Sequence, residues 1–110
     1  MVIDEDSVKS QLKHELVEIL KNMKERAKVA TDVGWSIRFP ESSDIVIFID
    51  ECIANFDGDE KRILWEIELL FAPTGTFQEL SMANGWAQDY ITIANKVDNI
   101  VKELKATINK

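Results

Sequence analysis

The sequence is poor in the residues from which most catalytic sites are built. Its 110 residues include one histidine, His14, and one cysteine, Cys52. A single cysteine excludes a disulfide within the chain and fits a reducing compartment. His14 is expected on the polar side of a helix, where it is a solvated residue rather than a general base. Cys52 lies within an apolar stripe, where a thiol is a poor nucleophile.

Motifs that bind metals or phosphate are also missing. With one cysteine and one histidine, a closed zinc site would have to be completed by carboxylates. The stretch 55–66 has the acid spacing of a calcium-binding loop, but Glu60 occupies the sixth position, where the turn needs glycine. Gly75 is not followed by the lysine of a phosphate-binding loop. We therefore expect no cofactor, no metal and no enzymatic activity.

Glycine and proline are scarce, and long apolar runs are absent. The chain has four glycines and two prolines, with 45% hydrophobic and 30% charged residues, a composition that is too apolar for disorder. No run approaches the ~20 apolar residues that span a bilayer. The acidic opening at residues 1–6 lacks the features of a signal peptide. These observations predict one domain over residues 1–110, located in the cytoplasm and not in contact with a membrane.

Negative charge is in excess, and it is not evenly spread. The net charge is −7, and residues 41–89 carry eleven acids against two bases, whereas residues 1–40 are neutral overall. Such a segment repels nucleic acids and anionic membranes and attracts basic proteins at long range. The plainer interpretation is that the excess charge keeps the protein soluble. If the charge is functional, a basic protein is the expected partner and nucleic acid is not.

Apolar residues recur every three or four positions along most of the chain, which is the period of an α-helix. The pattern predicts an all-α fold, a small helical bundle of four to five helices. The expected helices are Ser7–Ala30, Ser43–Phe56, Asp59–Phe71, a short helix that starts at Phe77, and Trp86–Ile108.

One segment allows a different fold. Residues 35–39 alternate apolar and polar side chains, and residues 45–49 are apolar enough for a buried strand, so an α+β fold with a short hairpin at 35–50 is the alternative. The helix is favoured because helical spacing continues to Phe56, whereas strand alternation stops after Ile49. Ser42 or Ser43 is expected to cap this helix.

Turn signals gather before the last helix. Pro73 cannot continue a helix, and the spacing Thr76-x-x-Glu79 is that of a capping box, which predicts a helix beginning at Phe77. Asn84-Gly85 then favours a left-handed stop. The stretch is expected to form a helix–turn–helix corner that fills the core.

The same stretch carries a resemblance to a known class of proteins. The run Ala72–Ser81, followed by Asn84-Gly85-Trp86 and an apolar helix to Val97-Asp98, resembles a segment of small cytosolic immunity proteins from bacterial polymorphic toxin systems. These include systems for contact-dependent growth inhibition. The resemblance implies an inhibitor that binds a cognate toxin domain, and not an enzyme.

Trp65 and Leu69 lie opposite the core stripe of their helix, and Ile47 does so on the neighbouring helix. Large apolar groups rimmed by acids are typical of a protein interface. Together with the resemblance, this surface predicts an immunity protein that neutralises a basic toxin domain, for example a nuclease, through an acidic surface. There are two alternatives. In one, the third helix is buried on all sides, and in the other, this surface belongs to a homodimer or an adaptor. The predicted contact residues are Asp44, Ile47, Glu51, Asp57, Asp59, Glu60, Trp65, Glu66, Glu68 and Leu69.

Overall fold

The computed structural model describes residues 5–30, 39, 41–72 and 75–108. These residues form helices and no strand, so the predicted all-α fold is confirmed. None of the helices is both long and apolar enough to cross a membrane. The helices are α1 (Glu5–Lys28), α2 (Ser42–Asn55), α3 (Glu60–Leu70), α4 (Thr76–Ala83) and α5 (Ala87–Ile108).

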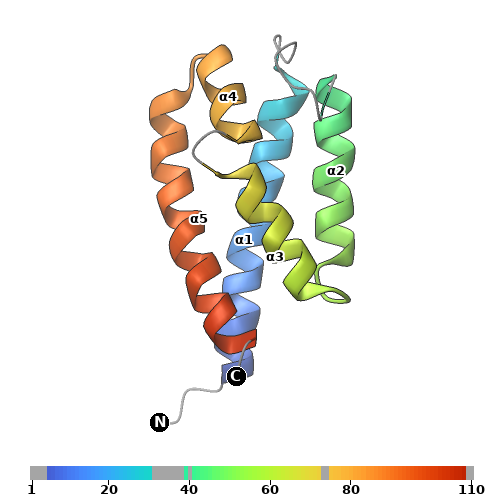
Figure 1. Cartoon of the computed structure of the whole chain (residues 1–110), viewed down its shortest axis with the longest axis vertical. Helices are drawn as coiled ribbons and strands as arrows, with labels where there is room; N and C mark the ends of the chain where they lie inside the picture. The colour runs from blue at the N-terminus through green and yellow to red at the C-terminus, as the bar shows by residue number, and fades with distance from the viewer. Residues whose placement is uncertain (1–4, 31–38, 40, 73–74, 109–110) are drawn as a thin grey trace.

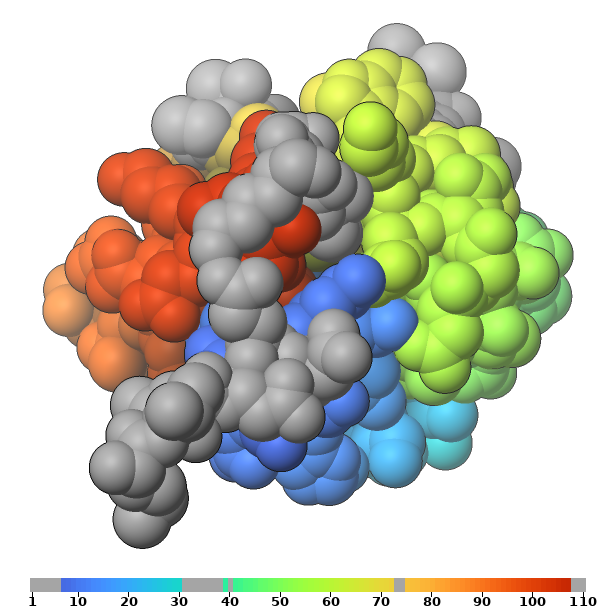
Figure 2. Space-filling model, turned by 90° about the horizontal axis from the view of Figure 1, so that it is seen from below, coloured from blue at the N-terminus to red at the C-terminus, as the bar shows by residue number. Residues whose placement is uncertain are grey.

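The helices form an up-down-up-down bundle in which α3 and α4 share the third position (Figure 1). The long helix α1 packs against α2 and α5, while α3 packs against α2 and α5, and α4 packs against α5. Seen from below, α1 lies between α5 on one side and the turn from α2 to α3 on the other (Figure 2). The third position is therefore the only one in the described bundle that is built from two helices.

The core runs along the whole bundle and is made of the predicted apolar stripes. Residues spaced three or four apart on each helix face inward, as amphipathic helices require. Cys52 is buried among them, as predicted. Among the described residues, the apolar ones with no exposed surface are Leu16, Leu20, Met23, Ala27, Ile45, Ile49, Ile67, Leu70, Phe77, Leu80 and Leu104.

The segment that allowed a strand is helical. Ile45 and Ile49 are buried one turn apart on α2, so the hairpin alternative is wrong for this half; residues 35–38 lie outside the described residues. The predicted serine cap is also wrong, because Glu41 is the N-cap. Its backbone N–H donates to Asp44 Oδ2 at 3.1 Å. A carboxylate in the first turn also suits the helix dipole.

The break between α3 and α4 depends on Gly75. Its N–H donates to the Ala72 carbonyl at 2.8 Å, and its own carbonyl accepts from the Glu79 N–H at 3.2 Å. A Cβ atom at Gly75 would lie 2.5 Å from the Leu69 carbonyl oxygen, so only glycine fits. Gly75 is thus the N-cap, and α4 begins at Thr76 without a side-chain cap. The predicted Thr76-x-x-Glu79 capping box is therefore wrong, and the helix begins one residue earlier than the predicted Phe77.

The end of α4 is as predicted. Gly85 has a φ of 84°, the left-handed conformation that glycine adopts without strain. The Trp86 N–H donates to the Ser81 carbonyl at 2.9 Å, which is the six-to-one bond of a Schellman motif. The guanidinium of Arg26 then lies 4.6 Å from the centroid of the Trp86 ring, so this corner is attached to α1.

Candidate functional site

The outer face of α3 exposes large apolar side chains. Trp65 is 56% exposed and Leu69 is 39% exposed, although both belong to a helix whose other face is fully buried. They lie one turn apart, so they form one continuous strip. The alternative that α3 is buried on all sides is wrong.

Ile47 is also exposed, at 55%, but it belongs to a different helix face. It lies on α2 opposite the buried Ile45, Ile49 and Cys52. Ile47, Trp65 and Leu69 therefore all point away from the core of the bundle. The predicted contact surface is divided between α2 and α3.

Acids at the turn from α2 to α3 are paired with bases from α1. Lys13 forms ion pairs with Asp57 and with Glu60, the latter at 3.2 Å, and Lys9 lies 3.0 Å from Glu60. Lys13 lowers the pKa of Asp57. Burial alone would raise the pKa of Glu60, but the hydrogen bonds from Lys9 and Lys13 outweigh it and lower that pKa. These acids tie α3 to α1.

Other predicted acids lie apart from this cluster. Asp59, the N-cap of α3, pairs with Arg62 in the first turn of that helix at 2.7 Å. Glu68 pairs with Lys105 and so links α3 to α5. Asp44 accepts a hydrogen bond at the start of α2. Glu51 is exposed and Glu66 is half-buried. The structure therefore brings Asp57 and Glu60 together but distributes the rest around the bundle.

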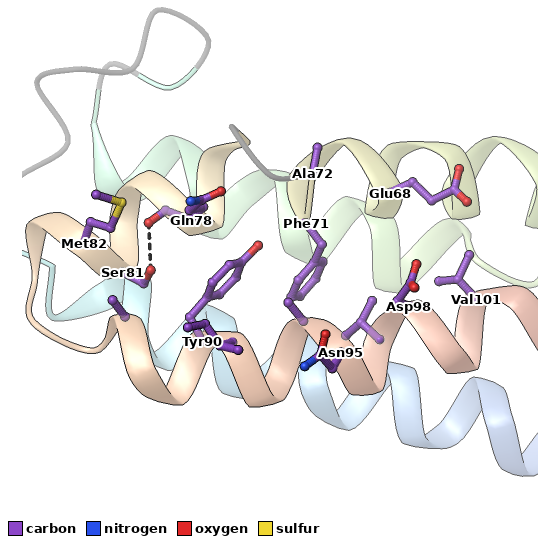
Figure 3. Close-up of a pocket in the computed structure, with 14 residues that line it drawn as sticks. Glu68, Phe71, Ala72, Gln78, Ser81, Met82, Tyr90, Asn95, Asp98 and Val101 are labelled. Atoms are coloured by element: carbon purple, nitrogen blue, oxygen red, sulfur yellow. Dashed lines mark hydrogen bonds between the residues drawn. The ribbon is translucent and has the colours of Figure 1, made fainter.

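A second surface was not predicted. A groove of about 760 Å³ runs between α5 and the row formed by α3 and α4 (Figure 3). Its rims carry two exposed side chains, Met82 at 61% and Ile91 at 54%. Most of its lining is apolar, with polar side chains such as Gln78 and Asp98 at intervals. Both this mixture and the volume are typical of binding sites.

Two aromatic rings lie between the walls of this groove (Figure 3). Phe71 and Tyr90 are stacked, with their centroids 6.0 Å apart and their planes within 5° of parallel. The Tyr90 hydroxyl is buried and has no hydrogen-bond partner within the described part of the chain. Burial raises the pKa of Tyr90 to about 12, so the phenol stays protonated at neutral pH.

The sequence contains a signal for this groove. Ala87, Ile91, Ala94, Asp98 and Val101 alternate spacings of four and three, which is a heptad pattern. Ala94 and Val101 also belong to the core-facing stripe of this helix, and two overlapping stripes are hard to separate by periodicity alone. The opposite wall, which comes from α3 and α4, has no sequence signal.

The fold and these surfaces define a helical bundle with two exposed apolar surfaces. No group of three or more potential metal ligands occurs among the described residues. Comparisons with protein-family models, curated proteins and solved structures find no match to this chain. The resemblance to immunity proteins is therefore carried by the quoted residues alone.

Proposed function

We propose that this chain is a non-catalytic inhibitor that binds a basic bacterial toxin domain through the outer faces of α2 and α3. The observation that carries the proposal is the exposure of Trp65, with Leu69 one turn away on the same face. An indole that is more than half exposed leaves a large apolar area in water. Tryptophan is also the residue type most enriched at the energetic centres of protein interfaces.

The charges of residues 41–89 support a basic partner. Exposed ion pairs such as Asp59–Arg62 contribute little stability in water, so a partner's bases can compete for these acids with little loss. Acids near an apolar centre attract a cationic domain during encounter and select it over other partners. The cationic cleft of a nuclease is one surface that fits this description.

A homodimer through the same face is the second candidate, and the same exposed Trp65 favours it. Sedimentation of the isolated chain separates the two. A native dimer that becomes a monomer after Trp65→Glu supports a self-associating module, whereas a monomer that binds the toxin domain supports the inhibitor.

The decisive experiment is co-expression with a toxin domain encoded beside the gene for this chain. Trp65→Glu should abolish protection of the host cell, because it places a charge at the apolar centre of the contact. Val29→Glu is the control, since Val29 is 78% exposed and belongs to neither α2 nor α3. It should leave protection intact.

The charge component is tested separately by binding kinetics. The association rate with the toxin domain should fall several-fold as salt rises from low to physiological concentration. An association rate that is independent of salt, the lack of a complex, or the lack of any toxin gene beside this one would count against the proposal.

A further inference from the structure

The side of α5 that lines the groove has the spacing of a helix that receives another helix. Ala87, Ile91, Ala94, Asp98 and Val101 all line the groove, at intervals of four, three, four and three. This repeat keeps one row of side chains aligned with a partner helix over several turns. Val101 is also part of the buried core and Ala94 packs against that core, whereas Ile91 and Asp98 are exposed.

The dimensions of the groove also suit a helix. The row from Ala87 to Val101 rises along α5 by about 21 Å, roughly four turns. Small side chains at Ala87 and Ala94 alternate with Ile91 and Val101, which allows a backbone to approach between the larger groups. Met82 forms part of the opposite wall, and methionine adapts its shape to an incoming apolar side chain.

The groove also holds a polar group without a partner. The Tyr90 hydroxyl lies between the two walls, where it neither donates nor accepts a hydrogen bond within the described residues (Figure 3). The neighbouring Ser81 hydroxyl already donates to the Gln78 carbonyl at 2.7 Å. Because this oxygen has almost no accessible surface, the donor or acceptor of an occupant reaches it only by parting the two walls.

Charge distinguishes one end of the groove. Asp98 is exposed and pairs with Lys102 at 3.4 Å within one turn of α5. Exposed pairs of this kind are weak, so a base on an occupant can compete for Asp98. We propose that this groove binds an amphipathic α-helix of another protein, with apolar residues at heptad spacing and a basic residue that pairs with Asp98.

Other occupants fit less well. A second copy of the chain would bring together two molecules that each carry a net charge of −7. A small amphiphile needs an apolar cavity but no heptad spacing on its wall. The inference does not depend on the proposed inhibition of a toxin, which assigns its contact to α2 and α3.

The probe is a synthetic helical peptide of about four turns with leucine at heptad positions and lysine on its polar face. A second peptide carries glutamate in place of lysine, and a third has the leucines out of register. In a titration followed by nuclear magnetic resonance, the lysine peptide should shift the signals of Met82, Tyr90 and Ile91. The out-of-register peptide should bind at least tenfold more weakly, and the glutamate peptide several-fold more weakly.

Substitutions locate the binding site. Ile91→Glu should weaken binding of the lysine peptide at least tenfold, whereas Trp65→Glu, at an equally exposed position on α3, should leave it within twofold. Asp98→Asn should remove the preference for lysine over glutamate. Circular dichroism checks that each variant keeps its helices, which is expected because all three positions are exposed.

Several results would overturn the proposal. One is the lack of any shift at the groove residues, and another is equal binding of all three peptides. A dimer that Ile91→Glu converts to a monomer would assign the groove to a second copy. Binding of the anionic dye anilinonaphthalene sulfonate in the groove, without competition from the lysine peptide, would assign it to small amphiphiles.

Discussion

At the scale of single residues, Tyr90 carries a polar group in an apolar environment. Its hydroxyl is buried without a partner, a condition that costs about 1–3 kcal/mol. Tyr90→Phe keeps the ring that stacks on Phe71 and removes the hydroxyl. We expect it to raise the free energy of unfolding by about 1 kcal/mol, measured by urea denaturation. Tyr90→Leu loses the stacking as well and should lower it; destabilisation by both variants would show that the hydroxyl is satisfied.

The ionisation of Tyr90 can be measured directly, because it is the only tyrosine in the sequence. Phenolate absorbance should titrate with a midpoint near 12 rather than the ordinary 10.0. Because the pKa of Tyr90 is raised in the folded state, the unfolded state loses its proton first, at pH 10. The free energy of unfolding is therefore unaffected by Tyr90 below pH 10 and falls as pH rises toward 12. A midpoint near 10 would mean that the hydroxyl is solvated.

At the scale of elements, the break between α3 and α4 depends on one glycine. A Cβ atom at Gly75 would lie 2.5 Å from the Leu69 carbonyl, so Gly75→Ala forces the backbone to move. We expect a loss of about 1–3 kcal/mol in urea denaturation. The matched control is Gly58→Ala, because the nearest atom to its added Cβ is the Asn55 carbonyl at 3.9 Å. If both variants lower the free energy of unfolding equally, the close approach of Gly75 to the Leu69 carbonyl is not the cause of the loss.

The helices themselves could be predicted because their apolar spacing persists for several turns. The two caps could not, for a local reason in each case. At α2 the carboxylate of Asp44 reaches back to the Glu41 N–H, and it replaces the expected serine cap. At α4 the contact of Gly75 with the end of α3 sets the first residue, and no sequence pattern encodes the packing of two chain segments.

At the scale of the whole molecule, the charge pattern has a structural role that the sequence tally could not show. Acids of the middle segment pair with bases from the terminal helices, as in Asp50–Lys24 between α2 and α1 and Glu68–Lys105 between α3 and α5. The acids are concentrated in the middle of the sequence, and in the folded bundle several of them form ion pairs with bases on neighbouring helices. The groove beside α5 was missed for a related reason, because it exists only where α3, α4 and α5 meet.

This pairing predicts loss of stability in acid. The pKa values of Glu60 and Asp57 are lowered by their lysine partners, below ordinary values of 4.5 and 3.8. Their contribution is therefore complete above those values and is lost as pH falls through the lower folded ones. The urea midpoint should drop between about pH 5 and pH 3. Glu60→Gln should flatten this dependence, whereas Glu51→Gln, an exposed carboxylate on α2, should retain it. An equally steep drop in Glu60→Gln would place the acid sensitivity elsewhere in the bundle.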